Sequence, residues 1–127
     1  MAVTTSTIAD PLGTKLIIDA NSDATSESNV TSSAAGTVYA VEIDNPNTSA
    51  VYTKLVQSTN PTVGTTAPDL QFKVPASSKQ TYLVGGGFAV TGLSFWTVTS
   101  PYAATGNNSN ATNSPSSAVK VKILCTF

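Results

Sequence analysis

The sequence contains no histidine and no arginine, and it contains a single cysteine. The absence of histidine excludes Ser-His-Asp triads and histidine-based proton transfer, and it deprives zinc of a usual ligand. Cys125 cannot form a disulfide within the chain, and no histidine is available to activate its thiol. Because Cys125 belongs to an alternating apolar run, we expect a buried, unreactive thiol.

Charged residues are scarce, at 10% of the sequence against about 25% in ordinary globular proteins. The net charge is −1 and the isoelectric point is near 5.0. The six basic residues are all lysines, and only Lys120 and Lys122 share a strand face. We therefore expect no nucleic-acid partner, since proteins that bind nucleic acids usually cluster their basic residues.

Long apolar runs are also lacking. No stretch approaches the roughly 20 residues that cross a membrane as a helix, and Met1–Ile8 has neither the basic start nor the apolar core of a signal peptide. We expect no membrane partner and synthesis in the cytoplasm. A hydrophobic content of 40% and a mean hydropathy of +0.07 are too apolar for a disordered chain, so the 127 residues predict one domain with its own core.

What the sequence does contain is apolar residues at every second position, in short runs separated by Pro, Gly and Asn. This pattern predicts seven or eight half-buried β-strands. The expected strands cover residues 14–19, 36–44, 50–56, 70–74, 80–84, 88–90, 92–99 and 118–127. Their spacing of about ten residues predicts an all-β fold, an antiparallel two-sheet β-sandwich with jelly-roll-like connections, formed as a single domain by residues 14–127.

Residues 1–13 read as a polar N-terminal arm whose apolar anchors are Val3 and Ile8. An arm of this composition cannot bury enough apolar surface to order itself. Extended backbone can add to an exposed sheet edge of another molecule, where main-chain hydrogen bonds supply affinity. We therefore expect the arm to lie on a neighbouring surface while residues 14–127 fold without it.

The alternation also predicts which side chains lie in the core. The expected core residues are Tyr39, Val41, Ile43, Leu55, Phe72, Phe95, Val121 and Ile123.

Four segments carry more specific expectations. The aliphatic run in residues 14–19 indicates a strand buried on both faces. Gly85–Gly87 indicates a sharp reversal or a bulge, because consecutive glycines permit positive φ. Residues 92–99 are apolar on both faces and need cover on both, part of which a neighbouring subunit could supply. The regions 20–35 and 100–117 read as loops, and Tyr102 is the aromatic most suited to external contact.

No constellation of residues points to catalysis or to metal binding. Asp19–Asp23 offers oxygen ligands but lacks the spacing and glycine of an EF-hand loop. A two-carboxylate glycosidase needs a deep cleft, for which this chain offers little material. The aromatic residues nearly all occupy strand positions, which favours core packing over a sugar-binding platform. We predict no catalytic residue, no metal and no cofactor.

The segment Gly36–Ser78 contains a series of strand and turn stretches that belong together, namely Thr37–Tyr39, Asp44–Asn45, Ala50–Leu55, Asn60–Thr66, Pro68 and Val74–Ser78. In this series the segment resembles small structural proteins encoded by tailed bacteriophages. The resemblance covers about a third of the chain strongly and about two thirds weakly. The missing arginine and the 100–117 loop do not match the family.

The resemblance implies a non-enzymatic virion protein, in the first place a capsid cement (decoration) protein on the outer capsid surface. As the resemblance implies, such a protein is made in the host cytoplasm, binds the major capsid protein and sits on three-fold or quasi-three-fold axes as a homotrimer. The alternatives are a tail- or fibre-associated receptor-binding module and, third, a small glycan hydrolase. The candidate assembly contacts are Val3, Ile8, Trp96 and Tyr102.

Overall fold

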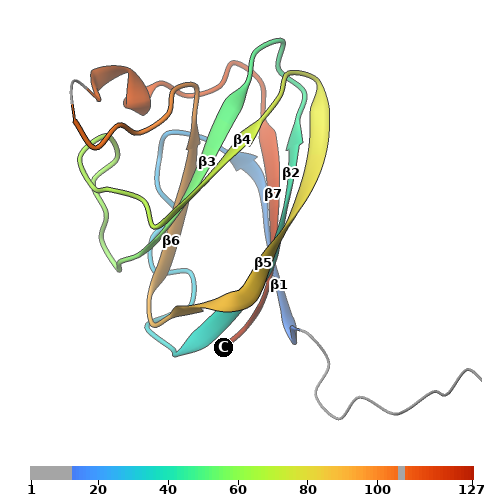
Figure 1. Ribbon diagram of the computed structural model, residues 1–127, viewed down its shortest axis with the longest axis vertical. Coiled ribbons are helices and arrows are strands. Elements are labelled where there is room, and N and C mark those ends of the chain that lie inside the picture. Colours follow the sequence, from blue (N-terminus) through green and yellow to red (C-terminus); the bar gives the residue numbers. More distant parts are fainter. Residues whose placement is uncertain (1–12, 106–107) are drawn as a thin grey trace, which may run out of the picture.

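The computed structural model describes residues 13–105 and 108–127, which form two antiparallel β-sheets and include no α-helix. The four-stranded sheet has the order β1 (Lys15–Ser22), β7 (Val119–Thr126), β2 (Gly36–Asn45) and β5 (Ser78–Val90). The three-stranded sheet has the order β4 (Leu70–Val74), β3 (Val51–Gln57) and β6 (Leu93–Val98). A short 3₁₀ turn covers Ser109–Thr112. The expected all-β architecture of two antiparallel sheets is therefore confirmed (Figure 1).

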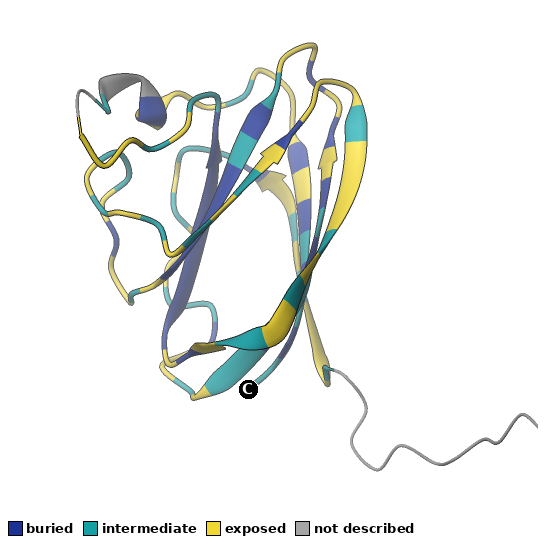
Figure 2. Ribbon diagram, viewed as in Figure 1, coloured by how far each residue is buried: buried dark blue, intermediate teal, exposed yellow. Residues whose placement is uncertain are grey.

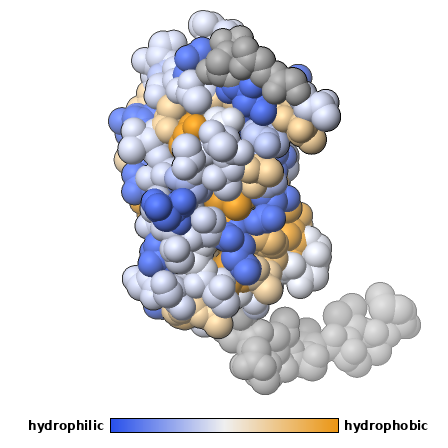
Figure 3. Space-filling view, turned by 90° about the vertical axis from the view of Figure 1, so that its left-hand side faces the viewer, coloured by the Kyte–Doolittle hydropathy of each residue, from blue (hydrophilic) through white to orange (hydrophobic). Residues whose placement is uncertain are grey.

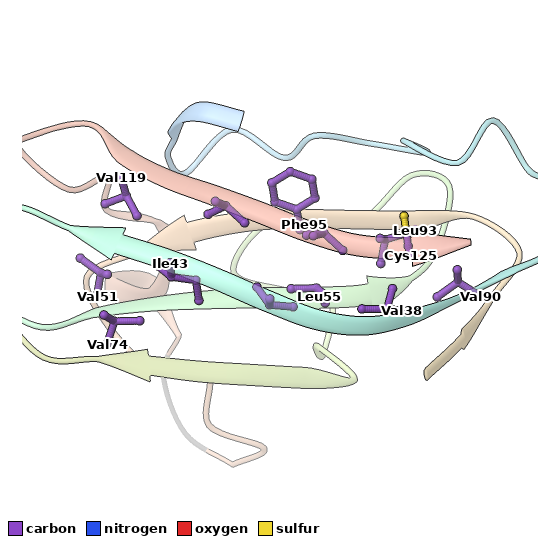
Figure 4. Close-up of a cluster of buried hydrophobic side chains, with 13 residues drawn as sticks. Val38, Ile43, Val51, Leu55, Val74, Val90, Leu93, Phe95, Val119 and Cys125 are labelled. Carbon is purple, nitrogen blue, oxygen red and sulfur yellow. The ribbon is translucent and has the colours of Figure 1, made fainter. Parts of the chain in front are cut away.

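The two sheets turn their inner faces toward each other around one apolar core. Strand alternation points every second side chain of β7 into the core. Alternate side chains of β2 and β3 point into the core in the same way. The close-up in Figure 4 shows these side chains converging from both sheets. The buried core residues are Val38, Val41, Ile43, Val51, Leu55, Val74, Val90, Leu93, Phe95, Val119, Val121, Ile123 and Cys125.

Most of the expected core residues are buried, and Phe72 is half-buried against the core beside Tyr82. Tyr39 is a correction, because it is also only half-buried and Val38 takes the inward place. Val38 and Ala40 pair with consecutive residues of β7, so Tyr39 is an extra residue in β2. This bulge shifts the alternation by one position, which the regular pattern in the sequence did not reveal.

The glycine run Gly85–Gly87 lies inside one long strand, and the sharp reversal that we considered is wrong. β5 passes through it, with Gly86 and Gly87 at φ values of 77° and 78°. The register with β2 shifts at this point, as the alternative of a bulge required. A Cβ atom on Gly87 would lie 2.4 Å from Cγ2 of Thr37. Glycine is thus needed here for its conformation and for close strand packing.

The first strand corrects a second expectation. Ile17 packs against the core, but Leu16 and Ile18 are 53% and 57% exposed, so β1 is buried on one face only. β1 lies at the edge of the four-stranded sheet and, among the described strands, pairs only with β7. Its outer face has no cover within residues 13–105 and 108–127.

Two buried asparagines, Asn45 and Asn47, connect the loops at one end of the molecule through hydrogen bonds. Nδ2 of Asn45 donates to the carbonyl oxygens of Ser49 and Pro75, each at 3.0 Å. Nδ2 of Asn47 donates to the carbonyl oxygen of Ser117 at 3.1 Å, and its Oδ1 accepts from the Ser117 amide at 2.7 Å. Three connections are therefore joined through satisfied buried amides.

The core assignment makes a test possible. Ile123→Ala removes a side chain that is 0% exposed, and it should cost about 2–5 kcal/mol of unfolding free energy. Leu83→Ala, at a side chain that is 78% exposed, is the matched control and should change stability by less than about 0.5 kcal/mol. Urea unfolding measures both. A loss below about 1 kcal/mol for Ile123→Ala would mean that the faces of β7 are assigned wrongly.

Candidate assembly surfaces

The outer face of the four-stranded sheet carries an unusual line of apolar side chains. Leu16 of β1 pairs with Leu124 of β7, Leu124 pairs with Ala40 of β2, and Ala40 pairs with Leu83 of β5. These four residues, here called the apolar row, cross the whole sheet with one apolar residue from each strand. Leu83 is the most exposed large apolar side chain of the described residues.

The surroundings of the apolar row extend its apolar character. Ile18 stands two residues beyond Leu16 on the same outward face. Shallow hollows flank the row, one between Leu16 and Leu124 and another between Leu83 and Tyr39. Every exposed large hydrophobic of the described residues, namely Leu16, Ile18 and Leu83, therefore lies on this one sheet face. A concentration of this kind marks an interaction surface more often than a scatter of single residues does.

A charged band runs beside the apolar row, farther along the same strands. Glu42 lies 3.6 Å from Nζ of Lys79 and 3.8 Å from Nζ of Lys122. Asp44 pairs in register with Lys79 and Lys120. Such exposed ion pairs add little stability, about 0–1 kcal/mol each. The band therefore places three lysines and two carboxylates beside the row, which gives this part of the surface a slight excess of positive charge.

The outer face of the three-stranded sheet is the opposite case, because the chain's own loops cover it. Val56, Trp96 and Val98 form a second buried cluster, against which Ala24 and Val63 pack. Figure 2 colours β6 as buried along its length, and Figure 3, which faces this side, shows orange only in a few small places. Trp96 is 1% exposed. The cover of this face, part of which we thought a neighbouring subunit could supply, thus comes from the chain itself, and Trp96 is buried within the single chain.

The free edge of β6 is closed in a similar way. The backbone of Glu27 exchanges two hydrogen bonds with Phe95, of 2.8 and 3.0 Å, and the amide of Val30 donates to the carbonyl oxygen of Leu93 at 2.8 Å. The segment around Glu27, expected as a loop, therefore lies along β6 without forming a full strand. This cover removes an edge at which other chains could add.

Lys54 occupies an unexpected position beneath the loops. It lies on the outward side of β3, between Gln71 of β4 and Trp96 of β6, and it is 1% exposed. Nζ of Lys54 lies 5.9 Å from the ring centre of Tyr102, whose amide donates to Oε1 of Gln71 at 2.8 Å. Tyr102 is therefore half-buried as a lid over Lys54 and is less exposed than the sequence suggested.

Burial lowers the pKa of Lys54 from 10.5 to about 8. No carboxylate within residues 13–105 and 108–127 forms an ion pair with it. The neighbouring Trp96 has a buried Nε1–H that finds no hydrogen-bond partner among the described residues. Both features are costly for folding. A lysine inside the apolar run Val51–Val56 was the available signal in the sequence, and the sequence reasoning missed it.

Val3 and Ile8 lie outside the described residues. Asp19 and Asp23 each accept a backbone hydrogen bond two residues further on, of 3.0 and 2.8 Å, as turn residues do. In the part of the chain that the structure describes, no three His, Cys, Asp or Glu side chains gather as metal ligands. Cys125 is buried as expected, and burial raises the pKa of its thiol.

Comparison with known proteins adds no identification. The sequence matches no family model, and no match is found among curated proteins or among solved structures. Within the described residues, no helix is long and apolar enough to cross a membrane.

The buried lysine generates a prediction about pH. Because the pKa of Lys54 is about 8 in the folded chain and 10.5 when unfolded, the unfolded chain binds more protons between these values. The free-energy penalty of burying the Lys54 ammonium should therefore disappear as the pH increases from about 8 to 10.5, and the unfolding free energy should rise over this range. Lys54→Met should raise the unfolding free energy at pH 7 by about 1–3 kcal/mol and abolish this rise.

Lys73→Met is the control, since Lys73 is exposed on the adjacent strand β4. Denaturant unfolding at several pH values gives the difference between each variant and the parent chain, which cancels the titration of other groups. A Lys54→Met chain that is less stable at pH 7 would show that the ammonium has a stabilising partner.

Proposed function

We propose that this protein is a non-enzymatic structural protein of a tailed-bacteriophage virion. Its role is that of a capsid cement (decoration) protein, which binds the outside of the capsid as a homo-oligomer and contacts the major capsid protein. The resemblance of Gly36–Ser78 to such proteins supports this assignment. The apolar row is the structural observation that carries it, because a surface of this kind needs a macromolecular partner.

The contrast between the two outer sheet faces suits a subunit of a symmetric assembly. One sheet face is sealed by loops, and the other is open and apolar across four strands. Burying an exposed leucine or isoleucine contributes about 1.5–3 kcal/mol at most. A single contact of this size is weak, but symmetric assembly repeats it, and avidity on a capsid lattice multiplies its effect.

The connections between the strands support a finer fold class. We assign the two sheets to a β-sandwich with jelly-roll-like connections. The links from β2 to β3, β4 to β5, β5 to β6 and β6 to β7 each join one sheet to the other. Frequent crossing between sheets is what Greek-key and jelly-roll folds require.

The other functions that the sequence left open have less support. A receptor-binding module needs aromatic side chains on an exposed loop rim, whereas Tyr102 is half-buried over Lys54. A glycan hydrolase needs two carboxyl groups across a cleft. Glu42 and Asp44, the nearest such residues on one strand, lie on an open sheet face and pair with lysines.

The direct test of the virion role is the composition of the particle. Purified particles of the phage that encodes this chain should contain it in a fixed ratio to the major capsid protein, as measured by quantitative mass spectrometry. Particles that lack the protein should rebind the purified parent chain, and Leu83→Ser should bind more weakly. Particles that neither contain nor bind the chain would refute the cement role.

The homo-oligomer makes a separate prediction in solution. Light scattering should give three times the chain mass of 13.0 kDa. Deletion of residues 2–9, which removes both expected anchors of the arm, should reduce this mass while the thermal unfolding transition stays in place. A parent chain that remains monomeric at micromolar concentration would contradict the trimer, and an unfolded deletion variant would mean that the arm belongs to the fold.

A further inference from the structure

The apolar row requires an occupant that the described residues do not provide. Leu16 and Leu83 stand at its two ends and are 53% and 78% exposed. The three-stranded sheet shows how this chain treats an apolar outer face when its own loops can reach it, because Trp96 there is 1% exposed. On the four-stranded sheet, no segment within residues 13–105 and 108–127 plays that part.

The arm joins the fold beside this row. Gly13 is packed so closely on Leu124 that a Cβ atom at residue 13 would lie 2.6 Å from Cγ of Leu124. The amide of Thr14 then donates to the carbonyl oxygen of Cys125 at 2.9 Å. Gly13, the first described residue, therefore lies next to the apolar row of its own molecule.

The length of the arm matches the width of the row. Neighbouring strands are about 4.8 Å apart, so the distance across the sheet from Leu16 to Leu83 is about 14 Å. Val3 and Ile8 are five residues apart, which corresponds to about 17 Å of extended backbone. Both anchors can thus contact one row at the same time.

The chemistry of the arm matches the row as well. Residues 1–12 contain no lysine, and Asp10 is their only charged side chain. The band beside the row holds Lys79, Lys120 and Lys122 against two carboxylates. The arm therefore offers two apolar anchors and one carboxylate to an apolar strip that has a small excess of positive charge beside it.

We infer that the apolar row is the docking site for residues 1–12 of a second copy of this chain, with Val3 and Ile8 as its anchors. The inference rests on the homo-oligomer of the proposed function, for which this row is the available apolar surface among the described residues. Contact between the arm of one copy and the sheet of the next is head-to-tail. Such contacts close into a ring when the rotation between copies permits it.

Disulfide trapping between separate molecules tests the inference. Full-length Ile8→Cys chains are mixed with full-length Leu83→Cys chains, and mild oxidation follows. Cys125 does not compete, because it is 0% exposed. The mixture should give a covalent heterodimer on a non-reducing gel. Ile8→Cys mixed with Gln57→Cys, an exposed position on the other sheet, is the control and should give none.

A second measurement uses association strength. Leu83→Ser should weaken the oligomer about tenfold by analytical ultracentrifugation, since the lost leucine contact is worth roughly 1.4 kcal/mol or more. Gln57→Ser should leave the association unchanged. Both substitutions are at exposed positions, so a shared thermal transition shows that the fold is intact.

Three results would overturn the inference. A chain carrying both cysteines that cross-links only within itself would place the arm on its own sheet. Loss of the oligomer in Leu83→Ser without any trapping by Ile8→Cys would mean that two sheet faces pack directly together. Absence of any oligomer would remove the second copy. If the disulfide trapping succeeds but phage particles neither contain nor bind this chain, the inference stands and the virion role is refuted.

Discussion

The structure depends on the burial of one shared core between two sheets. That core takes the inward side chains of β2, β3, β6 and β7, and the bulge at Tyr39 brings Val38 into it. Once those faces are used, each sheet is left with an outer face that must be covered or exposed. The chain covers the outer face of the three-stranded sheet with its own loops and leaves the apolar row on the other sheet open.

The two outer faces differ in what they cost and in what they can do. Beneath the loops, and within the described residues, Lys54 is buried without an ion-pair partner and Nε1–H of Trp96 is buried without a hydrogen-bond partner. Burial lowers the pKa of the lysine to about 8. The open face has little internal cost, because its Glu42 lies between two lysines. The exposed leucines of this face break no contact within the chain. They leave apolar surface area in water, which an assembly can bury.

The sequence predicted the all-β architecture and most of the core, because alternation at residues such as Ile43 and Ile123 is a local property. It failed where the answer depended on a distant partner. Leu16 and Ile18 read as doubly buried, since the sequence does not state that β1 is an edge strand. The apolar row exists only through the register of four strands that are remote in the chain, and the cover of Trp96 comes from loops whose paths alternation does not encode.

The central claim is that the outer face of the four-stranded sheet is buried in an assembly. Hydroxyl-radical footprinting with mass spectrometry tests it most directly, because it reports the solvent exposure of individual side chains. The oxidation of Leu16, Ile18 and Leu83 should fall together in the concentrated or capsid-bound protein relative to the diluted chain, while that of exposed side chains on the opposite sheet stays constant. Equal oxidation of these three residues in both states would contradict the account.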